Sequence, residues 1–424
     1  MTRFTHASLH MKIWWLVQLL PLLCSAFTLP AARFAPTQNR CEEFKLNAKA
    51  TATSTSTVSW CSPLLEEGYP PAVSEFKSNT LREKPLLIYL PGYDGTLLAP
   101  FLQLPELGTE FDVKGITVSM EDRSSVDELR ELVIGFITEE IKVNHSDGDT
   151  AKKESLSNAG RPVYIIGESF GGILALEVAL AIQEINSNDS SDININLQGI
   201  TLINPATCYN ESNLAKLGPP LTKLSPLLYP FALLKVIPLF TDSFALPQLL
   251  LILQSKGLPS VIDNAQREAY MGRVAFSIPN KLKFMPQQTL KWRLEEWLTK
   301  GCTALSKRDT CIMKLNVPVL LVAGEVDNTL PSVAEAGRLS RLLQKSTVHV
   351  VPGAGHACTS GSRVDLAALM RGAFPNLSAD GRTEMKSTAS SNSDDYFGLE
   401  ERYDKAGVGL MPFLYWSEDN YQAM

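Results

Sequence analysis

The residue best suited to covalent chemistry is Ser169, which lies in the sequence Gly167-Glu-Ser-Phe-Gly171. In a GxSxG sequence the serine occupies a sharp turn between a strand and a helix, and the glycines leave room for that turn. The apolar run VYII precedes it and a helical pattern follows it, which are the surroundings such a turn needs. We therefore predict that Ser169 is a nucleophile, with Gly167 and Gly171 forming the nucleophile elbow.

A serine hydroxyl is a weak nucleophile without a base, and histidine is the usual partner. Three histidines follow the N-terminal region, at positions 145, 349 and 356. His145 is expected in a polar loop before the nucleophile, and His349 alternates within a strand, where a structural role is expected. His356 follows that strand in the glycine-rich sequence PGAGHA, from which an imidazole can reach over the sheet edge. We predict His356 as the base.

The acid that orients the imidazole is expected at the end of the preceding strand. The sequence GEVD follows the apolar run LLV and offers Glu325 and Asp327. Asp327 is preferred, and Glu325 is interpreted as a solvated loop acid. The chain order Ser169, Asp327, His356 is that of the α/β-hydrolase fold and differs from the orders in chymotrypsin and subtilisin.

The tetrahedral intermediate of acyl transfer carries an oxyanion that needs two backbone N–H donors. The first is expected from Phe170, directly after the nucleophile. The second is expected from the loop PGYDGT after the first strand, where we choose Tyr93. Asp94-Gly95 in this loop is interpreted as a turn, with the alternative that the aspartate takes part as a charge.

These residues require a scaffold, and from residue 85 onward short apolar runs alternate with helical stretches. Alternating strands and helices favour a parallel sheet covered on both faces. We predict an α/β-hydrolase fold, a mostly parallel sheet covered by helices. The expected strands are 86–90, 163–166, 200–203, 317–322 and 347–351, and the expected helices are 125–143, 171–185 and 332–343.

The alternation stops between residues 206 and 315, and this segment is predicted to be a helical cap or lid. Its apolar part, 217–255, is rich in Leu, Ile, Phe and Pro. The prolines require several short helices, and charged residues keep every uncharged run too short to span a bilayer. One interpretation is an ordinary helical subdomain; the sharper one is a mobile apolar cap over a lipid substrate.

The N-terminus has the order of a secretory signal, with a basic start, an apolar centre and small residues before Phe27. A Thr- and Ser-rich stretch follows, as in transit peptides. A signal with Phe at its cleavage point and a transit-like continuation resembles the two-part plastid presequence of diatoms and related algae. We predict the plastid (chloroplast), with secretion or the ER as alternatives. The predicted parts are a signal peptide 1–26, a transit peptide and linker 27–75, core halves 76–205 and 316–375 flanking the cap, a disordered linker 376–395 and a C-terminal tail 396–424.

Composition excludes several classes of function. The 424 residues include 39 Lys or Arg and 45 Asp or Glu, for a net charge of −6, so no basic surface favours nucleic acid. Hydrophobic residues make up 45%, which is enough for a sizeable core and excludes disorder throughout. The seven cysteines form no CxxC pair and lack metal-ligand spacing. We expect neither a metal nor another cofactor.

Six sequences in this order resemble the plastid phytyl ester synthase family of esterase/lipase/thioesterase-type acyltransferases: LPGYDGT, EDR, IIGESFGG, INPAT, GEVDNTLPS and PGAGHA. The resemblance covers about residues 85–375 and implies that Ser169, Asp327 and His356 match the family triad. It also implies fatty acyl transfer from acyl-carrier protein, acyl-CoA or galactolipid to phytol or diacylglycerol. Two features depart from the family: the second, acyltransferase-like domain of plant members has a His-x4-Asp motif that has no counterpart here, and the first loop reads GTLL where a further glycine is expected.

The triad does not decide whether water or an alcohol receives the acyl group. We favour transfer, because the apolar insertion can exclude water and because of the resemblance. The expected partner is a lipid or acyl-thioester substrate, with association with a membrane surface as a further expectation. One alternative is a plain lipase or esterase hydrolysing plastid lipids or a chlorophyll-type ester. Another is a catalytically inactive scaffold that acts as a binding protein.

Overall fold

Three strands in the middle of the sheet are buried along their whole length: β2 (Leu86–Leu90), β4 (Val163–Glu168) and β6 (Val319–Gly324). Their apolar residues follow one another without polar alternation, which is typical of strands covered on both faces of a parallel sheet. The computed structural model describes residues 58–63, 84–97, 99–100, 103–146, 160–188, 194–233, 285–359 and 364–379, all within the unit formed by residues 41–424.

Seven strands form one sheet in the order β1-β3-β2-β4-β5-β6-β7. Strand β1 (Val58–Cys61) runs antiparallel to β3 (Asp112–Val118), and all other neighbouring strands are parallel. Strand β5 (Leu197–Ile203) lies between β4 and β6, and β7 (Ser346–Val351) forms an edge. The mostly parallel sheet predicted from the sequence is therefore confirmed.

The sequence did not reveal strand β1. It lies in the range 27–75 that was predicted to be transit peptide and linker, yet Val58 pairs with Val118 and Cys61 with Gly115. The sheet therefore begins before residue 76, the predicted start of the core. Four residues in a Thr- and Ser-rich stretch are too few to show a periodic pattern, and only the pairing with β3 identifies them as a strand.

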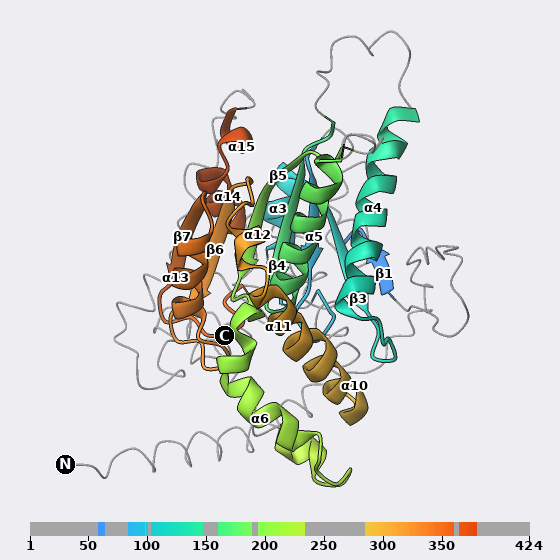
Figure 1. Ribbon diagram of the computed structural model, residues 1–424, viewed down its shortest axis with the longest axis vertical. Coiled ribbons are helices and arrows are strands. Elements are labelled where there is room, and N and C mark those ends of the chain that lie inside the picture. The colour runs from blue at the N-terminus through green and yellow to red at the C-terminus, as the bar shows by residue number, and fades with distance from the viewer. Residues whose placement is uncertain are drawn as a thin grey trace, which may run out of the picture. The chain divides into compact units, whose positions relative to one another are not determined.

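Helices cover both faces of the sheet (Figure 1). Successive residues of a strand point to opposite faces: in β2, Ile88 belongs to one hydrophobic cluster and Tyr89 to the other. The first cluster includes residues of α4 (Val126–Ser146), α5 (Phe170–Asn186) and α13 (Ser332–Leu342). The second includes residues of α3 (Leu104–Glu110), α14 (Leu366–Ala373) and α15 (Pro375–Ala379).

The described parts of the predicted cap, 206–233 and 285–315, are mainly helical, and α6, α10 and α11 gather at one end of the sheet (Figure 1). Leu290, Leu294 and Trp297 join the same buried cluster as α5, so these helices pack on the core. Most of the apolar stretch 217–255 lies outside the described residues. The elements are η2 (Ala206–Glu211), α6 (Asn213–Leu221), α10 (Gln287–Trp292), the π-helix η3 (Arg293–Lys300), α11 (Gly301–Ser306) and α12 (Asp309–Ile312).

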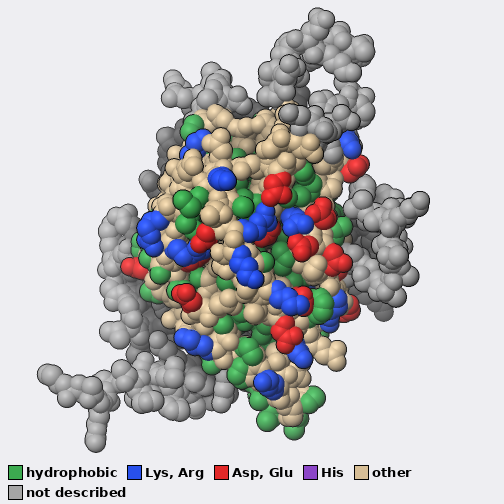
Figure 2. All heavy atoms as spheres, in the orientation of Figure 1, with side chains coloured by type: hydrophobic (Ala, Val, Ile, Leu, Met, Phe, Trp, Pro, Cys, Tyr) green, Lys and Arg blue, Asp and Glu red, His purple; other side chains and the backbone are tan. Residues whose placement is uncertain are grey.

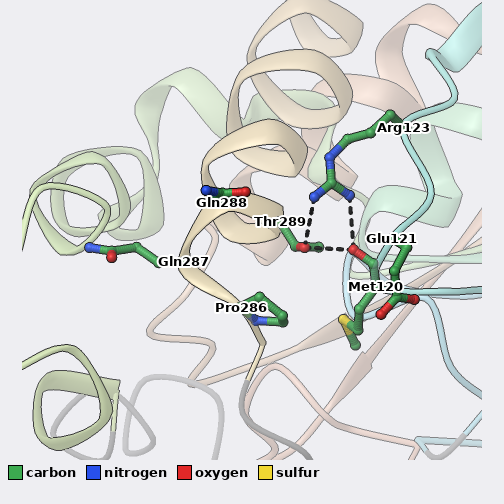
Figure 3. A pocket seen from close by; sticks show the side chains of 7 residues that line it. All are labelled: Met120, Glu121, Arg123, Pro286, Gln287, Gln288 and Thr289. Atoms are coloured by element: carbon green, nitrogen blue, oxygen red, sulfur yellow. Dashed lines mark hydrogen bonds between the residues drawn. The ribbon is translucent and has the colours of Figure 1, made fainter. Parts of the chain in front are cut away.

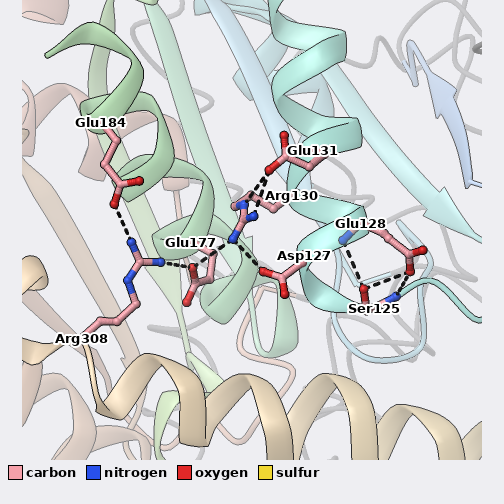
Figure 4. A network of polar contacts seen from close by, with 8 residues as sticks. All are labelled: Ser125, Asp127, Glu128, Arg130, Glu131, Glu177, Glu184 and Arg308. Atoms are coloured by element: carbon pink, nitrogen blue, oxygen red, sulfur yellow. Dashed lines mark hydrogen bonds and ion pairs between the residues drawn. The ribbon is translucent and has the colours of Figure 1, made fainter. Parts of the chain in front are cut away.

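An ionic network joins α4 and α5 to the segment before α12 (Figure 4). Glu177 of α5 is only 5% exposed and pairs with Arg308 and, at 3.8 Å, with Arg130 of α4. Arg308 also donates to Glu184 at 2.8 Å. Two cations around one buried carboxylate supply the charge compensation that its burial requires.

Among the described helices, none combines the length and the apolar character needed to cross a membrane. The predicted signal peptide 1–26 and C-terminal tail 396–424 lie outside the described residues. Of the predicted linker 376–395, the first four residues belong to α15 and the remainder is likewise outside the described residues.

Candidate active site

Ser169 lies at the tight turn between β4 and α5. Its φ of 54° places it in the left-handed region, which is unusual for a residue other than glycine. The surrounding backbone holds this conformation, because the Ser169 N–H donates to the Ile203 carbonyl at 2.9 Å and the Ser169 carbonyl accepts from Gly172 and Ala206. Such strain is characteristic of functional turns.

The glycines on both sides of Ser169 are required by close backbone contacts. A Cβ on Gly167 would lie 2.2 Å from the Gly171 carbonyl oxygen, and one on Gly171 would lie 2.1 Å from the Leu90 carbonyl oxygen. Both distances are far inside van der Waals contact. The glycines thus allow α5 to start directly against the ends of β2 and β4.

Ser169, Asp327 and His356 lie on three different loops, and their side chains are in contact. The Nε2 atom of His356 lies 3.0 Å from the Ser169 Oγ, and its Nδ1 lies 2.8 Å from Asp327 Oδ2. These loops follow β4, β6 and β7, and the carboxyl ends of parallel strands meet at the same edge of a sheet. The structure therefore brings together all three residues predicted from the sequence.

Asp327 is held as an anion. Its Oδ1 accepts backbone N–H bonds from Thr329 at 2.8 Å and Leu330 at 3.1 Å, and its Oδ2 accepts from the Ser332 hydroxyl. Burial alone would raise the Asp327 pKa, but the charge and hydrogen bond of His356 together with these donors lower it below its usual value. A carboxylate only accepts, so the Nδ1 of His356 carries the proton and Nε2 faces the serine hydroxyl as an acceptor.

The pKa of His356 is raised. Burial by itself would lower it, but this effect is outweighed by Asp327, through its charge and its hydrogen bond, with additional contributions from the carboxyls of Glu168 and Asp94. These negative charges stabilise the imidazolium that forms when the ring accepts a proton. The group can therefore act as a base that becomes an acid within one reaction cycle.

The loop after β2 lies beside the serine. A Cβ on Gly92 would be 3.6 Å from the Ser169 Cβ and 3.0 Å from Asp94 Oδ1. The Gly95 N–H donates to the Gly92 carbonyl at 2.9 Å, which is the turn predicted for Asp94-Gly95. Burial raises the Asp94 pKa and so opposes a charge on this carboxyl. The alternative, in which Asp94 takes part as a charge, is supported by its contribution to the raised pKa of His356.

Tyr93 and Phe170, the predicted oxyanion donors, follow β2 and the nucleophile respectively. Phe170 is the first residue of α5, and the first backbone N–H groups of a helix have no partner within it. The aim of both N–H groups toward an oxyanion stays a prediction. Tyr93 is partly buried against the core cluster, and burial raises the pKa of its hydroxyl well above its usual value.

The other titratable candidates lie elsewhere. His349 lies within the edge strand β7, and Glu325 is exposed, with one oxygen accepting the Gly353 N–H at 2.7 Å. His145 was predicted in a loop but falls in the last turn of α4, because the helix continues to Ser146. Among the described residues no group of three His, Cys, Asp or Glu side chains could hold a metal ion.

Sequence reasoning missed Asn204, which directly follows β5. It is fully buried and has a φ of 41°. Its Oδ1 accepts the Gly324 N–H at 2.8 Å, and its Nδ2 donates to the His356 carbonyl at 2.6 Å. The INPAT sequence was recognised, but nothing in it showed that its asparagine joins the acid and base loops.

Glu168, inside the GxSxG sequence, was also missed as a participant. It is 5% exposed, and its two oxygens accept from the hydroxyls of Tyr89 at 2.7 Å and Thr359 at 2.9 Å. Burial raises the Glu168 pKa, while these hydroxyls oppose that shift. The residue joins the nucleophile strand to the loop after His356.

A separate cavity of about 490 Å³ lies between the loop after β3 and the start of α10 (Figure 3). Arg123, from the EDR sequence, donates to the Met120 carbonyl at 2.8 Å and to the Thr289 hydroxyl at 3.2 Å. None of Ser169, Asp327 and His356 lines it. The lining residues are Met120, Glu121, Arg123, Pro286, Gln287, Gln288 and Thr289.

Residues 88–369 match the model of a family described as the alpha/beta hydrolase family. The chain is 27% identical over 296 residues to phytyl ester synthase 1, chloroplastic, and 27% over 306 residues to phytyl ester synthase 2, chloroplastic, both of Arabidopsis thaliana. These matches cover 69% and 68% of this chain, and the chain spans 37% of the length of each relative.

Solved structures are also similar to this chain. A meta-cleavage product hydrolase is 16% identical with a TM-score of 0.46, covering 69% of this chain and 91% of that structure. MenH from S. aureus is 15% identical with a TM-score of 0.44, covering 69% and 94%.

Proposed function

The chain belongs to the alpha/beta hydrolase family of enzymes, and on that premise we propose that Ser169 transfers acyl groups from lipid esters or thioesters. The observation that carries this proposal is the continuous pair of contacts from Ser169 Oγ through the imidazole of His356 to the carboxylate of Asp327. It is the arrangement that a serine needs to become a nucleophile at neutral pH.

The chemistry follows from these contacts. The Ser169 Oγ attacks the carbonyl carbon while its proton passes to His356 Nε2, and the imidazolium is stabilised by Asp327. The oxygen of the tetrahedral intermediate accepts from the N–H groups of Tyr93 and Phe170. The intermediate collapses as His356 returns the proton to the leaving alcohol or thiol, leaving the acyl group on Ser169. The Oγ of Ser169 is released in the second half of the reaction. An acceptor hydroxyl attacks the acyl carbon and gives its proton to His356, and the new tetrahedral intermediate collapses as the bond to Ser169 Oγ breaks and His356 returns the proton to that oxygen.

The acceptor that we propose is phytol or diacylglycerol, and the acyl group a fatty acyl chain. The support is the similarity to two phytyl ester synthases over 296 and 306 residues. The same acyl-enzyme also supports the alternative reaction with water, as a lipase or esterase on plastid lipids or a chlorophyll-type ester.

We propose a lipid substrate reached at a membrane surface. Leu227, Leu228 and Phe231 are 78%, 55% and 64% exposed, an unusual density of exposed apolar side chains. Figure 2 shows hydrophobic side chains at the lower end of the described surface, over the α6 segment. Insertion of such side chains into a lipid surface would bring the protein to water-insoluble substrates.

We propose the plastid as the location. The support is the description of both relatives as chloroplastic and the signal and transit pattern of the residues that precede strand β1. A fusion of residues 1–60 to a fluorescent protein in a diatom is expected to label the plastid. Secretion of the fusion into the medium would refute this assignment.

The product decides between transfer and hydrolysis. Purified protein receives a labelled long-chain acyl-thioester or galactolipid together with phytol, and the labelled products are separated. Labelled phytyl ester is the expected product, and Ser169→Ala is the control that should form none. Free fatty acid as the sole product would overturn the transferase proposal in favour of hydrolysis.

A further inference from the structure

Arg293, the first residue of η3, is fully buried although it carries a charge. Its Nη1 donates to the Tyr93 carbonyl at 2.8 Å, and its Nη2 donates to the carbonyls of Val118 at 3.1 Å and Ser119 at 2.7 Å. The guanidinium thus joins the loop after β2 to the end of β3 through backbone atoms. Charge-assisted bonds of this kind are stronger than neutral ones.

The environment of Arg293 makes this position costly for a cation. Burial lowers its pKa to about 10, with the charges of Asp94 and Asp122 opposing that effect. The loop fits closely around it, since a Cβ on Gly95 would lie 3.0 Å from Arg293 Nη1. The position therefore fixes the Tyr93 carbonyl, and with it the local course of the loop beside Ser169.

Trp297 lies four residues further along the same π-helix and holds the other side of the site. Its indole stacks on the Phe170 ring with 4.5 Å between centroids and 13° between planes. Its Nε1 donates to the Ser124 carbonyl at 2.8 Å, and the guanidinium of Arg293 lies 4.4 Å from its ring centroid. Arg293, Trp297 and Phe170 form one continuous stack.

The residues contacted by this π-helix include both proposed oxyanion donors. Arg293 holds Tyr93, and Trp297 holds Phe170. π-Helical segments are rare and occur frequently at functional sites. The segment belongs to the region predicted as a cap, so one helix from that region contacts both halves of the proposed oxyanion hole.

We propose that Arg293 and Trp297 are positioning residues that aim the N–H groups of Tyr93 and Phe170 at the oxyanion. This inference rests on the proposed function. It assigns these side chains an effect on the transition state, where an oxyanion exists, and little effect on the ground-state substrate. Removal of a single oxyanion donor costs about 10²–10³ in kcat, so misdirection of one donor is expected to cost about 10–100-fold.

The test compares a long-chain trifluoromethyl ketone with the matching methyl ketone as inhibitors of p-nitrophenyl ester cleavage by the full chain. Ser169 Oγ adds to the fluorinated ketone, its proton passes to His356, and the ketone oxygen becomes an oxyanion. The methyl ketone binds without forming a stable adduct. Only the first inhibitor therefore reports on the aim of the oxyanion donors.

Arg293→Met is expected to lower kcat and weaken the trifluoromethyl ketone by a similar factor, with KM and methyl ketone affinity unchanged. Trp297→Leu keeps an apolar side chain at position 297 and is expected to show a smaller loss of kcat and of trifluoromethyl ketone affinity. If Arg293→Met does not fold, the result for Trp297→Leu tests the inference. The matched control is Arg308→Met, which removes a partly buried arginine that pairs with Glu177 and Glu184. It is expected to reduce stability and leave the inhibition ratio unchanged.

The inference would be overturned if the ratio of the two inhibition constants stayed the same in both folded variants. That outcome includes the case in which both inhibitors are weakened by the same factor. Fluorophosphonate labelling of the wild type distinguishes a failure of this inference from a failure of the proposed function. If Ser169 is labelled and the ratio does not change, only this inference fails. If Ser169 is neither labelled nor inhibited by the fluorinated ketone, the proposed function fails with it.

Discussion

The side-chain amide of Asn204 donates a 2.6 Å hydrogen bond to the backbone carbonyl of His356. Its oxygen accepts from the Gly324 N–H, at the start of the loop that carries Asp327. One buried side chain at the end of β5 thereby connects the base loop and the acid loop. The relative placement of imidazole and carboxylate depends on a residue that contacts neither ring nor carboxylate.

Asn204→Gly tests this connection. Glycine accepts the left-handed backbone at this position, so the variant removes the side chain without adding strain, but leaves the Gly324 N–H and His356 carbonyl without this partner. Each such buried group costs about 1–3 kcal/mol. We expect a lower melting temperature and a reduced kcat with little change in KM. Asn204→Ala should be less stable still, because the left-handed backbone costs a residue with a Cβ roughly 1–2 kcal/mol. Equal stability of the Gly and Ala variants, or full kcat in both, would contradict this role.

Glu168 should shift the pH dependence of the reaction. The base must be neutral to accept the serine proton, so kcat/KM falls as the pH drops through the pKa of His356. Burial lowers that pKa, but Asp327 first, and then Glu168 and Asp94, raise it above the usual histidine value. Glu168→Gln removes one of these negative charges, so the acid limb of the kcat/KM profile should move to lower pH. An unchanged limb, or a move to higher pH, would contradict the assignment.

Two matched substitutions test whether Asp327 or Glu325 is the acid that orients His356. Asp327→Asn keeps the shape but removes the carboxylate that fixes the tautomer of His356, and we expect kcat to fall by about 10³–10⁴. Glu325→Gln changes an exposed carboxylate that accepts the Gly353 N–H, and kcat should stay close to the wild-type value. Steady-state kinetics with one ester substrate measures both, and the reverse pattern would exchange the two roles.

Gly171 and Gly135 offer a contrast in stability. A Cβ on Gly171 would meet the Leu90 carbonyl oxygen at 2.1 Å, so Gly171→Ala should displace α5 or prevent folding. Gly135, within α4, has nothing within 4 Å of the added atom, so Gly135→Ala should stabilise the protein by about 1 kcal/mol through helix propensity. Thermal unfolding of both variants tests the elbow geometry, and a fully stable Gly171→Ala would contradict it.

The α/β-hydrolase fold and the meeting of Ser169, Asp327 and His356 could both be predicted from the sequence. Short apolar runs identify buried strands, and a polar residue directly after such a run lies at the carboxyl edge of a parallel sheet. The GxSxG sequence additionally specifies its own turn. These signals are local, and the sheet then brings the ends of its strands together.

Asn204, Arg293 and Trp297 could not be predicted in the same way. Their partners are backbone carbonyls and an aromatic ring more than one hundred residues away, and a backbone atom leaves no trace in the sequence pattern. Arg293 and Trp297 also lie in a region where strand and helix alternation stops. Strand β1 was missed for a related reason, since its four residues are defined by their pairing with β3.

The account depends most directly on a covalent acyl group at Ser169. The wild-type protein is mixed with a long-chain acyl-thioester, quenched in acid within the first turnover and mapped by peptide mass spectrometry. We predict the mass of the acyl chain on the peptide that contains Ser169, and no such adduct in Ser169→Ala. An acyl group on another residue, or turnover that persists in Ser169→Ala, would contradict the account.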